Sequence, residues 1–464
     1  MTMWRPRLAE APGPLYRRVA LAVREDLAAG RLAAGTRLPT HRELARALKI
    51  TVVTASRAYR EAAAWGLVRG EVGRGTFVAA PAAGPRRLMP ERGDGGDGGD
   101  VVELTANFVQ IAGDEDGAPR PPAADARLLW EGLERRDPPG GGGDHRSAGA
   151  AWVKRGAWAP RAAEVVVTSG AQHAILVALA ALARPGDVLY VEALTYPGIK
   201  RAARTLGLQT RPVAIDEQGL IPAALAEQCG GRPGGVLFCQ PTLHNPTAAV
   251  MPRARRLELV EVARRFDLAL IEDSVYDFLL PDPPPPLAAL APERTCHIVS
   301  GSKAFAPGMR IGYLVAPEPL VPRLQEEVAA TGLFAAPSLI DLATRWIADG
   351  TAVRMCTARR REVESRQHIA QAILGTQGWI SHPASSHGWL QLPPPWRVEP
   401  FVEEARRRGV AVNPAAAFAA DPAAVPAAVR ICLGPLAERD RLAAALTRLA
   451  KILAAPAPPE EPVV

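Results

Sequence analysis

Several features that define common protein classes are missing from this sequence of 464 residues. The five cysteines are scattered and odd in number, with no CxxC pair or Cys/His cluster, so the sequence predicts neither a disulfide framework nor a metal site. The first residues lack the apolar core of a signal peptide. The longest clean apolar run, residues 174–183, is too short to span a bilayer. We therefore expect a soluble protein of a reducing cytoplasm.

The net charge of +7 is unevenly distributed. Residues 1–78 contain 14 Lys and Arg against 6 Asp and Glu, a surplus of eight positive charges, so the rest of the chain is close to neutral. A small basic head on a near-neutral body predicts that the head binds a polyanion. The length indicates two or three domains.

The head, residues 1–80, has the pattern of three helices and two strands. Apolar residues spaced four apart mark one face of the first helix: Leu15, Val19, Val23 and Leu27. Thr40 and Glu43 have the spacing of a capping box at the start of the second helix, and Thr51 can cap the third. Residues 67–68 and 76–78 are predicted to be short strands around a glycine-rich turn. This order predicts a winged helix-turn-helix.

Three motifs in the head resemble the DNA-binding domain of GntR-type bacterial regulators. They are Leu-Pro-Thr-His-Arg-Glu-Leu at 38–44, Ala-Tyr at 58–59 and Gly-Arg-Gly-Thr-Phe-Val at 73–78. The resemblance implies an operator in double-stranded DNA as the partner, approached by Arg42, Thr51, Thr54, Gly73 and Arg74. Arginine can read guanine edges or phosphates, while threonine hydroxyls and backbone N–H groups bind phosphates.

The third helix departs from the family at Val52 and Val53, where a polar or basic residue is usual. Valine can contact a thymine methyl group but cannot hold a phosphate, so affinity and base preference stay open. The alternative to DNA binding is a winged helix that binds protein.

Residues 81–100 are rich in alanine, proline and glycine and end in a Gly-Asp repeat. Such a composition cannot build a core and predicts a flexible linker. It would let the head move relative to the body, residues 101–464, although a plain connector fits the sequence equally well.

The body repeats a pattern in which a short apolar strand ends in a polar or glycine-rich turn. Strands are expected at 164–169, 187–192, 234–239 and 268–273. Gly170, Tyr196, Asn245 and Asp273 lie at or just past their carboxyl ends, the edge at which open α/β sheets bind ligands. The glycine turn at 170 leads directly into a helix, an arrangement that binds phosphate.

Residues 297–315 are predicted to be two apolar strands joined by turns that carry Lys303. Lysine is rarely buried without a function, and burial favours the neutral amine that attacks carbonyls. Ser300, Ser302 and Arg310 suit a phosphate. These residues indicate a Schiff-base lysine for pyridoxal phosphate (PLP); the alternative is a lysine in a surface turn.

Together these motifs resemble the large domain of fold-type I PLP enzymes, the aspartate aminotransferase fold. The resemblance implies an α/β fold with a mostly parallel sheet and a small C-terminal α/β domain at about 320–455. It also implies which residues bind each part of PLP. The phosphate would be bound by the backbone of Gly170, Ala171 and Gln172 and by Ser300, Ser302 and Arg310. Tyr196 would stack on the ring, Asn245 and Tyr276 would bind the ring hydroxyl, Asp273 would bind the ring nitrogen, and Lys303 would form the internal aldimine. Lys303, Asp273 and Tyr276 would be the catalytic residues.

The substrate side and the dimer follow from the same resemblance. Arg430, with Asn245, would bind a substrate α-carboxylate through its guanidinium fork. These enzymes commonly have a tyrosine that reaches the phosphate of the partner subunit, but residues 136–152 contain none. His145 or Arg146 are the candidates to replace it, and transaminase competence stays open.

A GntR-like head joined to an aminotransferase-like body resembles the MocR subfamily of bacterial transcriptional regulators. This implies a PLP-responsive, DNA-binding, domain-swapped homodimer of the cytoplasm, located at the nucleoid when bound to DNA, with an amino acid or amine as effector. Two alternatives remain: an active PLP-dependent aminotransferase with an accessory head, and a constitutive DNA-binding scaffold whose body only dimerises.

Overall fold

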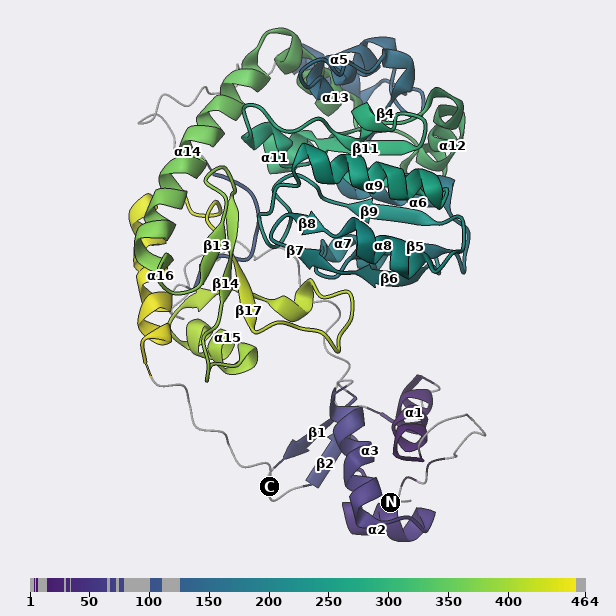
Figure 1. Cartoon of the computed structure of the whole chain (residues 1–464), viewed down its shortest axis with the longest axis vertical. Helices are drawn as coiled ribbons and strands as arrows, with labels where there is room; N and C mark the ends of the chain where they lie inside the picture. The colour runs from purple at the N-terminus through teal and green to yellow at the C-terminus, as the bar shows by residue number, and fades with distance from the viewer. Residues whose placement is uncertain are drawn as a thin grey trace. The chain divides into compact units, whose positions relative to one another are not determined.

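The computed structural model describes residues 4, 6, 15–28, 31–33, 35–64, 67–71, 75–78, 101–110 and 126–455 (Figure 1). The chain divides into two compact units, Met1–Gly95 and Gly96–Val464, and each is described by itself. The predicted linker at 81–100 and the predicted DNA-contacting residues Gly73 and Arg74 lie outside the described residues.

The first unit has the winged helix-turn-helix architecture that the sequence predicts. Its elements are α1 (Leu15–Ala28), α2 (His41–Leu48), α3 (Val52–Ala64) and the antiparallel pair β1 (Val68–Glu71) and β2 (Gly75–Val78). The capping box is present: Thr40 Oγ1 accepts a hydrogen bond from the Glu43 N–H at 3.3 Å, and the Glu43 carboxylate accepts one from the Thr40 N–H at 2.8 Å. The buried Tyr59 of α3 donates to the Pro39 carbonyl at 2.8 Å and so ties α3 to the start of α2.

A seven-stranded sheet forms the centre of the second unit, in the order β4-β12-β11-β10-β9-β5-β6. The strands are β4 (Val165–Thr168), β5 (Val188–Glu192), β6 (Gln209–Val213), β9 (Val236–Cys239), β10 (Ala269–Asp273), β11 (Thr295–Ser300) and β12 (Gly312–Val315). β12 runs antiparallel to β4 and β11, and the other neighbouring pairs of this sheet are parallel. The mostly parallel sheet of the sequence prediction is therefore confirmed.

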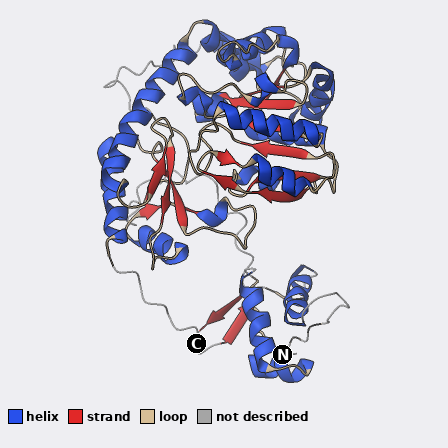
Figure 2. Cartoon of the chain, viewed as in Figure 1, coloured by secondary structure: helices blue, strands red, loops and turns tan. Residues whose placement is uncertain are grey.

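Helices cover both faces of this sheet (Figure 2). Alternate residues of each strand face opposite sides, as Ile271 and Leu270 of β10 do when they join different apolar clusters. One face is covered by α6 (Ala171–Leu182), α7 (Pro197–Thr205) and α12 (Val321–Gly332). The other is covered by α5 (Gly143–Val153), α8 (Pro222–Cys229), α9 (Arg253–Arg265), α10 (Leu287–Leu290) and α13 (Pro337–Ala348).

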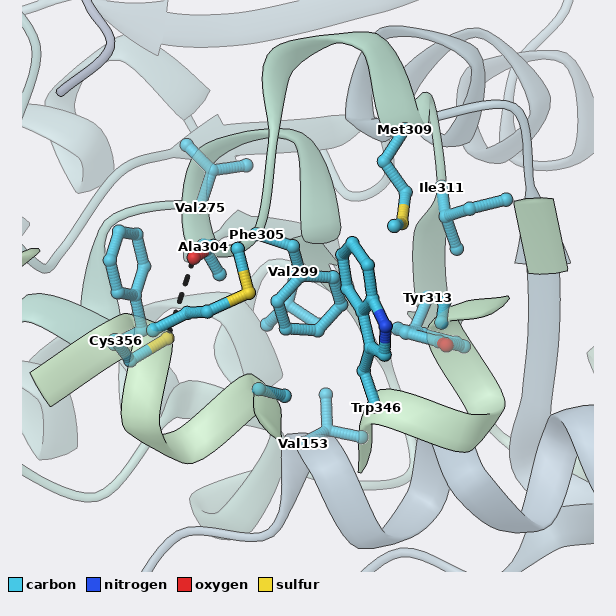
Figure 3. Close-up of a cluster of buried hydrophobic side chains, with 14 of the residues drawn as sticks. Val153, Val275, Val299, Ala304, Phe305, Met309, Ile311, Tyr313, Trp346 and Cys356 are labelled. Atoms are coloured by element: carbon cyan, nitrogen blue, oxygen red, sulfur yellow. Dashed lines mark hydrogen bonds between the residues drawn. The ribbon is translucent and has the colours of Figure 1, made fainter. Parts of the chain in front are cut away.

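The apolar cluster beneath α5 and α13 also fixes the backbone just after Lys303 (Figure 3). Phe305 is fully buried and packs edge-on against Trp346, with ring centroids 6.4 Å apart. Cys356 Sγ lies 3.6 Å from the Ala304 carbonyl oxygen, the contact drawn in Figure 3. The short helix α11 (Gly301–Ala304), which contains Lys303, is thus held against a rigid core.

A smaller, four-stranded sheet in the order β13-β14-β17-β16 forms the C-terminal part. Its strands are β13 (Trp379–Ser381), β14 (His387–Gln391), β16 (Asn413–Pro414) and β17 (Ala428–Cys432), with α14 (Thr351–Leu374), α15 (Val398–Arg407) and α16 (Arg439–Leu453) as its helices. Asn413 and Pro414 form β16, which pairs with β17. Helices α12 and α13 fall in the range 320–350 that the sequence gave to the small domain, yet their apolar sides pack on the large sheet.

The remaining elements are α4 (Ala126–Leu133), the hairpin β7 (Ile215–Asp216) and β8 (Gly219–Leu220), β3 (Val102–Glu103) and β15 (Val410–Ala411). β3 pairs in parallel with β15, so the first residues of the body belong to the small domain. Within the described ranges, no helix has the length and apolarity needed to cross a membrane. The five cysteines are all buried and free of disulfides.

Candidate functional sites

The candidate PLP residues converge at one edge of the large sheet. They lie at or just past the carboxyl ends of the parallel strands β4, β5, β9, β10 and β11, or just before β12: Gly170, Ala171, Gln172, Tyr196, Asn245, Asp273, Tyr276, Ser300, Ser302, Lys303 and Arg310. Carboxyl ends of parallel strands meet at the same edge, and this is why residues scattered over 140 positions of the sequence come together.

The first turn of α6 and the start of α11 form a cradle suited to a phosphate. Gly170 has φ 93° and precedes α6, whose first N–H groups have no partner within the helix. A Cβ at Gly170 would lie 3.0 Å from Arg310 Nη2, so glycine lets this arginine approach. Ser302 Oγ is buried and finds no hydrogen-bond partner among the described residues. A buried hydroxyl without a partner, N–H groups without partners in their helix and a guanidinium are the kinds of group that bind an anionic ligand.

Two further groups border this cradle. Ser300 Oγ accepts a hydrogen bond from the Ser302 N–H at 3.1 Å, so it fixes the turn that carries Ser302. The Gln172 side chain donates to the Gly198 carbonyl at 3.3 Å, which directs it toward α7. Ala171 is the first residue of α6 and offers only its backbone.

Lys303 lies in the one-turn helix α11, whereas the sequence placed it in a turn. Its Nζ donates a hydrogen bond to the backbone carbonyl of Asn107. Burial lowers the pKa of this amine to about 8, with the positive charge of Arg430 acting in the same direction and Asp273 opposing it. A substantial fraction of Lys303 is therefore neutral, and thus nucleophilic, near physiological pH.

Asp273 is buried at the end of β10, and burial raises its pKa to about 7. Its carboxylate accepts hydrogen bonds from Gln240 Nε2 at 2.8 Å and from the Val275 N–H at 3.3 Å. The Gln240 N–H in turn donates to Glu192 at 3.0 Å. These hydrogen bonds fix the orientation of the carboxyl group. A cation placed next to it would stabilise its ionised form.

Two tyrosines lie near these groups. Tyr196 precedes α7, and burial followed by the Asp273 charge raises its pKa. Tyr276 Oη accepts a hydrogen bond from Asn107 Nδ2 at 2.9 Å, and its pKa is also raised by burial. Both phenols are therefore neutral donors at ordinary pH.

Arg430 of β17 reaches this edge from the small domain. Its Nη1 donates to Asn245 Oδ1 at 3.0 Å and its Nη2 to the Thr105 carbonyl. The guanidinium carbon lies 4.8 Å from the centroid of the Phe418 ring. Its buried Nε has no partner among the described residues, so the fork retains capacity for an anion such as a carboxylate.

Sequence reasoning missed Asn107, Gln240 and His387. His387 Nε2 lies 3.0 Å from the His244 carbonyl and must donate to it, so Nδ1 is left to accept from Asn107 Nδ2 at 3.0 Å. Burial, with Arg430 nearby, lowers the His387 pKa to about 3, consistent with this neutral tautomer. Gln240 carried a weak signal, because it directly follows β9; Asn107 and His387 follow no strand end of the large sheet.

The two candidates for the missing tyrosine differ in their surroundings. His145 is buried, with Nε2 2.9 Å from Asp341 Oδ1, and its Nδ1 accepts a hydrogen bond from the Gly142 N–H at 3.3 Å. Both its nitrogens are thus occupied within its own subunit. Arg146 keeps a buried Nε without a partner among the described residues. Of the two, Arg146 is better able to bind a further anion.

The start of α3 carries the described part of the candidate DNA surface. Thr51 Oγ1 accepts from the Thr54 N–H at 3.1 Å and lies 2.8 Å from Thr54 Oγ1, so both hydroxyls serve the helix cap. Val53 is 73% exposed and Val52 46%, which leaves two large apolar side chains in solvent at the helix start. Arg42, on α2, is also exposed.

Comparison with known proteins gives the same two parts. Residues 134–446 match the family described as aminotransferase class I and II, and residues 15–78 match the gntR family of bacterial regulatory proteins. The uncharacterized HTH-type transcriptional regulator YdeF of Bacillus subtilis is 29% identical over 437 residues, covering 92% of each chain. The HTH-type transcriptional regulator TauR of Rhodobacter capsulatus is 29% identical over 88% of this chain and 90% of its own.

The solved structures support the fold of the body. The α-aminoadipate aminotransferase LysN from Thermus thermophilus aligns with a TM-score of 0.68 at 22% identity, over 76% of this chain and 92% of its own. The chain therefore belongs to the aminotransferase class I and II family, whose members normally bind PLP. With its GntR-type head, it is a MocR-type transcriptional regulator that has an aminotransferase-like domain.

Proposed function

We propose that the protein is a PLP-responsive regulator in which ligand binding at Lys303 changes how the head binds operator DNA. The observation that supports this most directly is the arrangement at the sheet edge. A partly neutral lysine amine, an oriented buried carboxyl group and an anion cradle lie together there. When bound, PLP supplies two things: an electron-accepting ring, and an aldehyde that condenses with an amine.

Each residue has a role in this proposal that follows from its contacts. Ser302, Arg310 and the first N–H groups of α6 hold the phosphate, while Asp273 pairs with the ring nitrogen. Asn245 and Tyr276 donate to the ring hydroxyl, and Tyr196 lies against the ring. Arg430 binds the carboxylate of an amino acid effector; an amine effector would leave it unused.

The DNA and the partner subunit complete the proposal. The basic head binds an operator through Arg42 and the start of α3, with the wing residues Gly73 and Arg74 at the backbone. The protein acts in the bacterial cytoplasm as a homodimer, domain-swapped as the MocR resemblance implies, with Arg146 near the phosphate of the partner's site.

The decisive test is an absorbance titration of the purified protein with PLP beside Lys303→Ala. We expect a band near the edge of the visible range that the variant lacks. DNA fragments from next to the gene are then titrated with and without PLP, and we expect the dissociation constant to change. Two results would favour a DNA-binding scaffold instead. One is that the wild-type protein shows no band; the other is that DNA binding is the same with and without PLP and in Lys303→Ala.

A working aminotransferase is the second candidate, because Lys303, Asp273 and Arg430 all line one edge. It predicts turnover of an amino acid with a keto acid that is unchanged when residues 1–80 are deleted. We expect turnover to be slow, since the subunit-bridging tyrosine is missing. Fast turnover that DNA does not affect would favour the enzyme.

A further inference from the structure

Residues 105–107 accept hydrogen bonds from both cations that the proposed ligands require. Lys303 Nζ donates to the Asn107 carbonyl, and Arg430 Nη2 donates to the Thr105 carbonyl. The Lys303 amine, in its neutral form, would condense with an aldehyde, and the Arg430 guanidinium would bind a carboxylate. One short stretch of backbone is therefore bonded to both ends of the candidate site.

The Asn107 side chain connects the same stretch to both domains of the body. Its Nδ2 donates to Tyr276 Oη at 2.9 Å in the large domain and to His387 Nδ1 at 3.0 Å in the small domain. Its Oδ1 accepts from Ser386 Oγ at 2.8 Å. Asn107 is only 8% exposed, and its side chain makes a hydrogen bond through every donor hydrogen.

Backbone hydrogen bonds join residues 101–110 to the small domain along their length. The N–H groups of Val102, Leu104 and Gln110 donate to the carbonyls of Gly409, Ala411 and Gly434 at 2.8, 2.9 and 2.8 Å. The contact is tight, because a Cβ at Gly434 would lie 2.1 Å from the Phe108 carbonyl oxygen. The segment also follows the predicted linker directly, with Val101 next to residue 100.

A ligand at the site must compete for the hydrogen bonds that Lys303 and Arg430 donate to residues 105–107. Joining an amine to an aldehyde releases water and leaves at most one hydrogen on the nitrogen, against three on a free ammonium. A carboxylate that takes both arms of an arginine fork competes with any carbonyl on that fork. Occupancy at either position therefore changes the hydrogen bonds of residues 105–107.

We infer that residues 105–107 are the element that senses ligand binding and transmits it to β3 and the linker, with Asn107 as the positioning residue. This inference rests on the proposed function, and it names the path by which the same site regulates the head. Coupling between two sites requires that a ligand change the relative stability of two states of the protein. Here two donors whose hydrogen bonds depend on the ligand act on the same segment.

Hydrogen–deuterium exchange of the full-length protein, with and without PLP, tests the inference. In the wild-type protein we expect PLP to change exchange at the amides of Val102, Leu104 and Gln110 by at least about threefold. Asn107→Ala keeps the backbone carbonyl that accepts from Lys303 but loses the side-chain bonds to Tyr276, His387 and Ser386, so we expect the exchange response and the PLP effect on DNA affinity to diminish. Thr295→Ala removes a buried hydroxyl that donates to the Ala291 carbonyl at the first residue of β11, outside the Asn107 network, and is the control that should respond as the wild type does.

The outcomes separate the two proposals. A band without any exchange response in the wild type, or an undiminished response in Asn107→Ala, would overturn the inference and leave PLP binding intact. No band in the wild type would overturn the proposed function and this inference with it. Should Asn107→Ala fail to fold, Ser386→Ala removes only the hydroxyl that donates to Asn107 Oδ1 and should weaken the response.

Discussion

Lys303 and Asp273 show how burial sets the chemistry of single residues at the candidate site. Burial moves their pKa values toward each other, to about 8 for the amine and about 7 for the carboxyl group. Both groups thus change protonation near neutral pH, as residues with chemical roles commonly do. An exposed lysine or aspartate would titrate several pH units away.

The lysine pKa predicts a pH dependence for PLP binding. The folded-state pKa lies below the usual value for lysine, so the neutral amine is lost as pH falls through about 8. We expect the rate at which the absorbance band appears to fall about tenfold per pH unit below 8 and to level off above it. Stopped-flow mixing between pH 6 and 10 measures this, and a plateau that begins only near pH 10 would contradict it.

Arg42 gives the corresponding prediction for the head. If it contacts a base, Arg42→Ala weakens operator binding by about 1–3 kcal/mol. Arg323→Ala removes the same charge from an exposed position on α12 and is the control. Titrations at matched salt that give equal isotherms for Arg42→Ala and the wild type would refute the contact.

Residues that follow a strand of the large sheet could be selected from the sequence, because strand ends of one sheet share an edge. Asn107 and His387 could not. They are 280 positions apart, and their hydrogen bond exists only because the small domain brings the start of the body beside β14. No local pattern records such a contact.

At the scale of elements, local signals predicted most boundaries. The Thr40 and Glu43 pair marked the start of α2, and apolar runs marked the strands of the large sheet. Predictions failed where tertiary packing decided the conformation. Lys303 lies in a helix because Ala304 and Phe305 are anchored in the core. Helices α12 and α13 pack on the large sheet, although their range was assigned to the small domain.

Thr40→Ala tests the capping box of α2. Removing an N-cap hydroxyl typically costs about 1 kcal/mol, which corresponds to about a fivefold increase in local opening. We therefore expect the amides of Glu43 and Leu44 to exchange about fivefold faster, while those of α1 keep their rates as an internal control. Unchanged exchange in α2 would mean that packing, not the cap, stabilises its first turn.

At the scale of the whole molecule, an exposed apolar pair bears on assembly. Trp130 and Leu133 of α4 are 62% and 73% exposed, whereas Gly132 between them packs directly on Ser338 of α13. Helix α4 is thus fixed to the body through its glycine and presents two large apolar side chains to solvent. Such side chains suit an interface.

The proposed homodimer predicts the effect of charges at this pair. Trp130→Asp combined with Leu133→Asp should raise the dimer dissociation constant by at least about tenfold, because a buried carboxylate without a partner is costly. Sedimentation velocity over a concentration series measures this. Val425→Asp, at another exposed apolar position, is the control. A double variant that stays as dimeric as the wild type would exclude α4 from the interface.

The burial of all five cysteines has a practical consequence for testing whether the head responds to ligand. Every cysteine lies in the second unit, and burial raises the pKa of thiols such as Cys296 and Cys356 to about 12. Thiol reagents require an accessible thiolate, so the folded protein should be almost inert to them. A single cysteine introduced on the surface of the head would then be the only site to react. A fluorescent label attached there would report on the surroundings of the head without removing any native residue.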